Sequence, residues 1–79
     1  MLNNFVLMCR IVEMTDKRII TNNDAEYYEI QISVKMHDNL IKYQIKRNDL
    51  IVIKGHITND NGLVAEKISF LSSKQIDND

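Results

Sequence analysis

Apolar residues recur at every second position along much of this chain, and this spacing limits what the chain can fold into. The clearest case is the segment 27–36, where two sets of five side chains alternate. One set is apolar: Tyr28, Ile30, Ile32, Val34 and Met36. The other is mostly polar: Tyr27, Glu29, Gln31, Ser33 and Lys35. Because successive strand residues point to opposite faces of a sheet, the segment is predicted to be a strand with one solvated face.

Four other segments also predict strands: Phe5 to Met14, Lys17 to Thr21, Asp49 to Thr58 and Leu63 to Leu71. The first is an almost continuous apolar run, broken only by Arg10 and Glu13, and its β-branched residues favour a long strand over a helix. Residues 22–24 are predicted to form a turn. The run Asn59-Asp60-Asn61-Gly62 tolerates a left-handed backbone and predicts a hairpin between the last two strands.

Residues His37 to Arg47 fit two structures. Asp38 could cap a short helix with Leu40, Ile41 and Ile45 on its buried side. The alternation of Ile41, Tyr43 and Ile45 fits another strand. The helix is preferred, because three strands, a helix and two strands make a known closed unit, the five-stranded OB-fold barrel. The fold class is therefore predicted to be all-β with one short helix, with one domain over residues 1–73 and a short polar tail over 74–79.

A chain of 79 residues buries only about 60% of its unfolded surface, and a single cysteine, Cys9, provides no disulfide within it. We therefore expect self-association, as a homodimer or homotetramer, through a sheet edge or an apolar face. The long first strand is the place where such pairing is expected. The lone cysteine fits a reducing compartment, and no run approaches the ~20 apolar residues of a membrane span. A cytoplasmic protein is expected.

The residue types that carry enzyme chemistry are sparse and lack the spacing of known sites. His37, His56 and Cys9 do not show the spacing of metal ligands or of a nucleophile motif. Cys9 lies in the most apolar run, where a buried thiol is the simpler interpretation. Two glycines, Gly55 and Gly62, cannot make a glycine-rich phosphate loop. We expect no catalytic residue, no metal and no cofactor, and the chain is expected not to be an enzyme.

A binding surface remains as the functional feature. On the predicted strand 27–36, Tyr27, Ser33 and Lys35 lie in line on the solvated face, and Lys54 shares a face with His56 on the strand 49–58. An aromatic ring with cations along one sheet face suits a single strand of nucleic acid, because bases stack on the ring and lysines follow the phosphates. The alternative is an ordinary solvated sheet face.

The net charge of the whole chain is −1, which gives no global attraction for nucleic acid. The charge is unevenly distributed along the sequence. Residues 35–56 hold five cations against two carboxylates, whereas residues 13–29 hold five carboxylates against two cations. One side of the fold is therefore expected to be locally basic.

Several segments together resemble the bacterial single-stranded DNA-binding protein family, which includes its small relative primosomal replication protein N. These are Met1 to Arg10, Glu26-Tyr27 with Ile30 to Met36, Tyr43 with Lys46-Arg47, Leu50 to Ile57, and Val64 to Leu71. The resemblance covers about three quarters of the chain, in the family's order. It implies that Tyr27 stacks on a base, that Lys35 stands at a basic position, and that Ser33 stands where many members have a second aromatic residue.

The chain also departs from that family. Its second strand and the adjoining loops are short, Cys9 replaces a glycine of the first strand, and there is no tryptophan. The acidic end Ile76-Asp77-Asn78-Asp79 lacks the family's terminal hydrophobic residue. These departures weaken the expectation of extended DNA wrapping and of partner recruitment through a tail.

The expected function is non-catalytic binding of single-stranded DNA, with RNA as the alternative ligand, in replication, recombination or repair. Tyr27 would stack on a base. Phosphates would be neutralised by Lys35, Lys42, Arg47, Lys54 and Arg10, with Ser33 and His56 on the same surface. The competing hypothesis is a protein-interaction module, an accessory subunit of a replication or mobile-element protein with little DNA affinity of its own.

Overall fold

Strand β1 (Asn4–Met14) pairs with two neighbours along its length, and this curls the sheet. Its first part pairs antiparallel with the strand over residues 50–57, from Asn4 opposite His56 to Arg10 opposite Leu50. Its second part pairs antiparallel with the strand over residues 18–23, from Arg10 opposite Asn22 to Met14 opposite Ile19. A register shift between Ile11 and Glu13 marks a bulge in the second part, and bulges increase the local bend of a strand.

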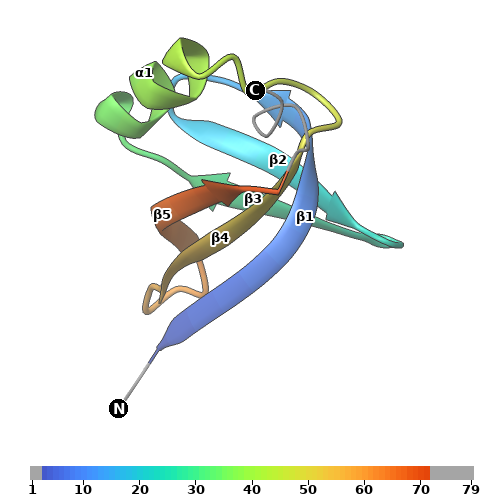
Figure 1. The fold of residues 1–79 in the computed structure, drawn as a ribbon. Coiled ribbons are helices and arrows are strands. Elements are labelled where there is room, and N and C mark those ends of the chain that lie inside the picture. The colour runs from blue at the N-terminus through green and yellow to red at the C-terminus, as the bar shows by residue number, and fades with distance from the viewer. Residues whose placement is uncertain (1–2, 72–79) are drawn as a thin grey trace.

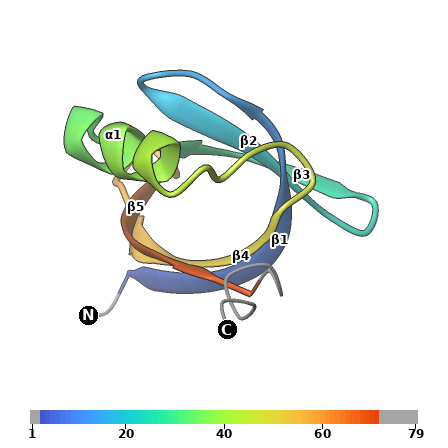
Figure 2. The ribbon, with the colours of Figure 1, turned by 45° about the horizontal axis from the view of Figure 1, so that its top comes forward.

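The computed structural model describes residues 3–71. The remaining elements are β2 (Arg18–Asn23), β3 (Glu26–Gln31), α1 (Val34–Lys42), β4 (Leu50–Ile57) and β5 (Leu63–Phe70). The strands form a closed barrel in the order β1-β2-β3-β5-β4, with α1 across one end (Figures 1 and 2). The order of the strands and the closure of the sheet confirm the predicted five-stranded OB-fold barrel with one short helix. The predicted boundary at residue 73 and the tail 74–79 lie outside the described residues.

Alternate residues of the strands fill the barrel, as the period of two predicts. The buried apolar side chains are Cys9, Ile11, Ile19, Ile30, Ile32, Leu40, Ile45, Ile51, Ile53 and Ala65. Burial raises the pKa of the Cys9 thiol, which suits an inert core residue. On β4, Lys54 points outward between the buried Ile53 and Gly55, so the predicted division of that strand into two faces is confirmed.

The prediction of one strand from Tyr27 to Met36 is wrong beyond Gln31. The Oγ of Ser33 accepts a hydrogen bond from the backbone N–H of Met36 at 3.0 Å, which makes Ser33 the N-cap of α1. A capping serine satisfies an N–H group that the first helical turn leaves unpaired. Capping therefore overrides the alternating pattern at its last positions, and Val34, predicted to be buried, is 65% exposed on the helix.

The structure confirms that a short helix precedes β4, but the predicted bounds of this helix within 37–47 and its predicted cap are wrong. It begins four residues before Asp38 and ends at Lys42, because Gln44 adopts a left-handed backbone with φ 61°. Leu40 and Ile45 are buried as predicted, whereas Ile41 is 54% exposed. The other bounds differ little from the prediction, and β2 is displaced toward Asn23. No helix of residues 3–71 is long and apolar enough to cross a membrane.

The cap of α1 can be tested by two substitutions. We expect Ser33→Ala to lower the free energy of unfolding by about 1 kcal/mol, because it removes the acceptor of the Met36 N–H group. Asp38→Ala, at the residue that the sequence pattern favoured as the cap, is the control and should change stability less. Urea denaturation followed by circular dichroism measures both. A larger loss for Asp38→Ala would contradict this assignment.

Candidate nucleic-acid interface

The structure places the predicted site residues in separate regions of the surface. Tyr27 is on β3, Ser33 caps α1, and Lys35 and Lys42 are on α1. Arg10 is on β1 and Arg47 in the loop before β4, whereas Lys54 and His56 are on β4. The predicted line of Tyr27, Ser33 and Lys35 is therefore wrong, because β3 ends at Gln31 and the helix takes the last two residues in another direction.

Tyr27 is an exposed aromatic residue on the outer face of β3. It is 66% exposed, lies opposite Asn22 of β2, and shares a hollow with Gln31 and with Asn61 and Gly62 of the β4–β5 turn. In OB-folds this sheet face and the loops beside it are the usual oligonucleotide-binding surface. The structure thus puts the aromatic residue that the sequence singled out on the side of the barrel where the fold class binds such ligands.

The β4–β5 turn beside Tyr27 is held by its own hydrogen bonds. The backbone N–H of Gly62 donates to the hydroxyl of Thr58 at 2.8 Å, and that hydroxyl donates to the carboxylate of Asp60. This second bond is the main reason why the pKa of Asp60 is lowered from its usual value. The turn is therefore shaped in advance, but its carboxylate stays charged at neutral pH and adds no attraction for phosphate.

The β2–β3 face provides few cations for phosphates. The guanidinium of Arg18 lies 2.8 Å from the carboxylate of Glu29 across the two strands, so its charge is already partly neutralised. Glu26 and Asp24 at the β2–β3 turn add negative charge. This region matches the acidic segment 13–29 of the sequence, and the basic surface must therefore lie on other strands.

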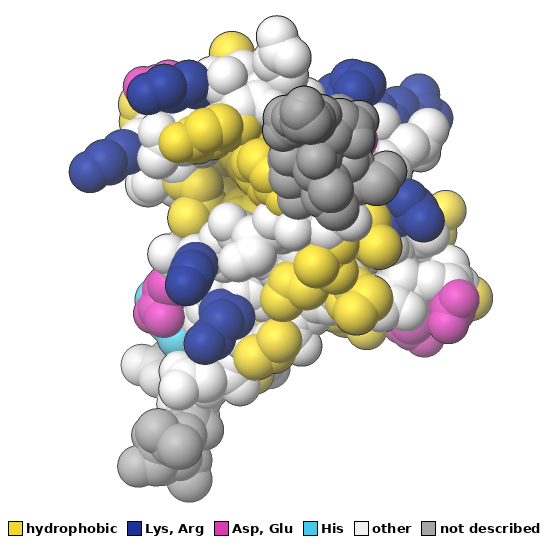
Figure 3. Space-filling model, in the orientation of Figure 1, with side chains coloured by type: hydrophobic (Ala, Val, Ile, Leu, Met, Phe, Trp, Pro, Cys, Tyr) yellow, Lys and Arg dark blue, Asp and Glu magenta, His cyan; other side chains and the backbone are white. Residues whose placement is uncertain are grey.

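Two lysines face each other on the outer side of β4 and β5. Lys54 is directly opposite Lys67, both are exposed, and neither forms an ion pair with a carboxylate of residues 3–71. Like charges directly opposite each other destabilise a sheet. Figure 3 shows cationic side chains grouped on this part of the surface. The pair is a site where an anion would relieve repulsion within the protein.

A bulge creates this lysine pair. From Ile57 opposite Leu63 to Gly55 opposite Ala65 the register is regular, and continuing it would put Lys54 opposite Glu66. The register shifts at Lys54, so that Lys67 and not Glu66 lies opposite it. The carboxylate of Glu66 instead lies 2.6 Å from the Nδ1 atom of His56. Sequence reasoning missed Lys67, because the bulge that brings it opposite Lys54 is not visible in the sequence pattern.

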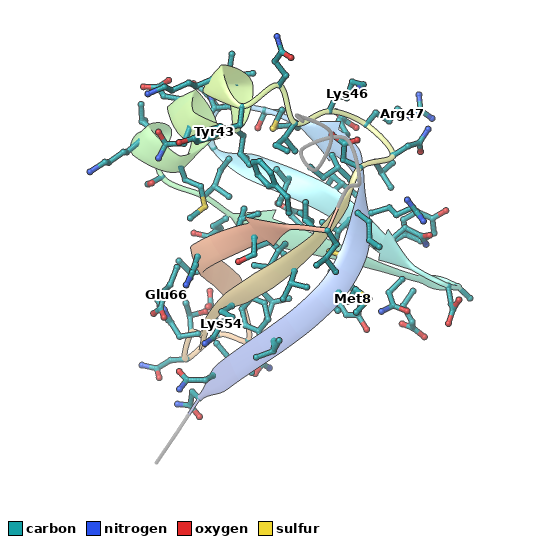
Figure 4. All side chains as sticks on the ribbon, in the orientation of Figure 1. Met8, Tyr43, Lys46, Arg47, Lys54 and Glu66 are labelled. Atoms are coloured by element: carbon teal, nitrogen blue, oxygen red, sulfur yellow. The ribbon has the colours of Figure 1, made fainter. Side chains whose placement is uncertain are left out.

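The remaining predicted cations lie on β1, in the loop before β4 and on α1. Arg10 donates a hydrogen bond to the backbone oxygen of Asn48 at 2.9 Å, which ties its guanidinium to the loop that carries Lys46 and Arg47 (Figure 4). Lys35 and Lys42 are exposed on α1. The cations of α1 and of the loop before β4 lie toward the end of the barrel that α1 covers (Figures 1 and 4).

Apolar side chains lie on the outer face of β1 and β4. This β1–β4 face consists of Val6, Met8, Leu50, Val52 and Leu71, and appears in Figure 3 as a band of hydrophobic side chains. Val6 is 67% exposed and Met8 is 53% exposed. In the described structure, residues 4–9 of β1 pair only with β4, and at the second edge the side chain of Asn23 donates to the Met8 oxygen at 2.7 Å.

No protein-family model matches the chain, and a search of curated proteins found no match. Solved structures do match it. The mitochondrial single-stranded DNA-binding protein Rim1 of S. cerevisiae aligns in one crystal form with a TM-score of 0.71 at 16% identity, over 91% of this chain and 96% of that chain. A second form gives a TM-score of 0.72 at 15% identity, with the same coverage of both chains.

The S. pombe Stn1-Ten1 complex is also similar, with a TM-score of 0.61 at 10% identity, over 92% of this chain and 61% of that chain. At these identities the likeness shows the fold. It supports the OB-fold without supporting the bacterial family in particular. In the described part of the chain, no group of three or more His, Cys, Asp or Glu residues is placed to hold a metal ion.

The repulsion between the two lysines can be measured in the free protein. We expect Lys54→Glu to raise the free energy of unfolding by about 0.5 kcal/mol at low salt, because it replaces a cross-strand repulsion with an attraction. Added salt should reduce the gain by screening. Urea denaturation at two salt concentrations measures the effect. A loss of stability at low salt would show that the pair is not repulsive.

Proposed function

We propose that this protein binds single-stranded nucleic acid, DNA in the first place, and catalyses no reaction on it. The observation that carries the proposal is the end-to-end likeness to Rim1, which covers 91% of this chain and 96% of that chain. The shared barrel is thus nearly the whole of a chain that is named a single-stranded DNA-binding protein. Replication, recombination or repair, which expose single strands, are the processes in which we place this activity, with the cytoplasm as the expected compartment.

The ring of Tyr27 is the proposed stacking platform for a base. It is exposed on β3 beside a turn that is already ordered, so little conformational freedom is lost on binding. Lys54 and Lys67 are the proposed main phosphate contacts, since binding removes their mutual repulsion. Longer-range attraction would come from Arg10, Lys35, Lys42 and Arg47, whereas His56 is engaged with the Glu66 carboxylate. Ser33 is left to its capping role, because its oxygen is already engaged with the Met36 N–H group.

The proposal is tested by fluorescence anisotropy of a labelled oligothymidine, with a duplex as control. We expect binding to the single strand that weakens as salt rises, because phosphate contacts release counterions. Tyr27→Ala should weaken binding about tenfold at every salt concentration, because it removes one stacked base. Lys54→Gln should instead flatten the salt dependence by about one phosphate contact. Equal affinity of Tyr27→Ala and the unmodified protein would reject the role of Tyr27.

The second candidate function is the protein-interaction module, and the β1–β4 face is the observation that favours it. An exposed apolar surface flanked by cations fits contact with another protein better than contact with DNA, since it carries no aromatic ring for bases. Absence of oligothymidine binding at low salt, with protein in the tens of micromolar, would favour this function over the first.

We also propose that two copies of the chain associate as a homodimer through β1. In the described structure, the second edge of β1 has no strand partner along residues 4–9, where the Met8 oxygen accepts from the Asn23 side chain, and the exposed Val6 and Met8 stand beside that edge. An open sheet edge with apolar side chains is a template for pairing with another strand. A two-fold pairing of β1 with β1 of a second copy would cover the backbone edge and part of the β1–β4 face.

The dimer is tested by light scattering coupled to size-exclusion chromatography. We expect Val6→Lys to shift the protein to a monomer, because two new charges would meet at the centre of the interface. Val34→Lys is the matched control, since Val34 is 65% exposed on α1, away from β1, and its replacement should leave the dimer intact. A monomeric unmodified protein at micromolar concentration would refute the proposal.

A further inference from the structure

A groove separates α1 from β5 and shares Lys67 with the site described above. Its apolar floor is formed by Met36 and Leu40 of the helix and by Ile68 and Phe70 of the strand, and it encloses about 270 Å³. Figure 3 shows hydrophobic side chains in a hollow beside α1. This α1–β5 groove is a little smaller than the usual range of about 300–1,000 Å³ for sites of drug-sized ligands, so it suits a ligand of one ring system.

An exposed tyrosine stands at the mouth of the α1–β5 groove. Tyr43, the C-cap residue of α1, is 58% exposed, and its ring centre is 5.6 Å from that of Phe70 in an edge-to-face arrangement. Gln44, which follows it directly, has a left-handed backbone with φ 61° and does not continue the helix. The ring is therefore positioned by Phe70 while more than half of its surface is left open to a ligand.

Three polar groups around the mouth have the chemistry that a nucleotide needs, and the one carboxylate of the lining, that of Glu66, is engaged by the His56 ring at 2.6 Å. The Lys42 ammonium lies 6.0 Å from the centre of the Tyr43 ring, and Lys67 lines the opposite wall from β5. The amide of Asn39, also in the lining, can both donate to and accept from the edge of a base. A purely aliphatic ligand would gain nothing from these three groups, whereas a base with its phosphate would use all of them.

We propose that the α1–β5 groove binds one unpaired nucleobase, stacked on Tyr43 with its phosphate at Lys67. This inference rests on the proposed function and extends it to a second base site, remote from Tyr27. Both hollows share β5: Leu63 at its start lines the first, and Lys67 further along lines the second. A single strand that follows β5 from the β4–β5 turn toward α1 would meet Tyr27, the Lys54–Lys67 pair and Tyr43 in turn.

The inference is tested by photo-crosslinking and by two variants of one residue. Oligothymidine carrying 5-iodouracil is irradiated with the protein, and crosslinked peptides are identified by mass spectrometry. We expect crosslinks at Tyr43 as well as at Tyr27. Tyr43→Leu should weaken oligothymidine binding about tenfold, because it keeps an apolar residue but removes the stacking ring. Tyr43→Phe keeps the ring and should bind as the unmodified protein does.

The outcomes separate this inference from the proposed function. If Tyr43→Leu binds oligothymidine as tightly as the unmodified protein and crosslinks form at Tyr27 alone, the groove site is refuted. The proposed binding of a single strand would still hold. No binding by the unmodified protein would reject both. If Tyr43→Leu unfolds, Asn39→Asp replaces it, since a carboxylate at the mouth should repel the phosphate and lower the affinity without disturbing the apolar floor. Unchanged affinity of that variant would also overturn the inference.

Discussion

Closure of the barrel depends on a short parallel contact between β3 and β5. It consists of Ile30 opposite Leu63 and Gln31 opposite Val64, and joins the two ends of an otherwise antiparallel sheet. Beyond this contact the chain must leave the sheet, and the backbone N–H of Ile32 is satisfied by the oxygen of Lys17 at 2.9 Å. Ser33 then caps α1 at once. The position of the helix, and with it the α1–β5 groove, therefore follows from where β3 stops pairing.

Much of the fold could be predicted from the sequence, because strand periodicity and turn chemistry are local signals. The five strands, the hairpin at 59–62 and the presence of one helix are all found in the structure. The boundary between β3 and α1 was not predictable in this way. Alternation favoured a strand through Met36, whereas the structure ends it at Gln31, where pairing with β5 ends and a serine is available as a cap.

Less of the candidate site could be predicted, because it depends on register and on tertiary placement. Tyr27, Lys54 and His56 were found from alternation alone, and each points outward as expected. Lys67 was not found, since the bulge at Lys54 and Gly55 puts two lysines opposite each other where a regular register would pair Lys54 with Glu66. From the sequence, Tyr43 entered the argument only in the alternation of residues 41–45 and in the family resemblance, and neither made it a site residue. Its place beside Phe70 requires the fold, because the two residues are far apart in the chain.

The β2–β3 face, which is the usual oligonucleotide-binding face of an OB-fold, carries few cations that could contact phosphates. Arg18 is committed to Glu29 on that face, whereas Lys54 on β4 and Lys67 on β5 form no ion pair with a carboxylate of residues 3–71. A net charge of −1 is thus compatible with phosphate binding, provided that the strand runs toward β5. Tyr27 shares a hollow with Leu63 at the start of β5, and Tyr43 contacts Phe70 at its end, which gives a physical basis for a path along β5.

The central claim is that a single strand of nucleic acid lies along β5 between the two exposed tyrosines. The most direct measurement is a titration of the ¹⁵N-labelled protein with a short oligothymidine, followed through its amide NMR signals. We predict shifts concentrated on residues of β3, the β4–β5 turn, β5 and the end of α1. Shifts confined to β1 and its neighbours, or no shifts at millimolar oligonucleotide, would contradict it.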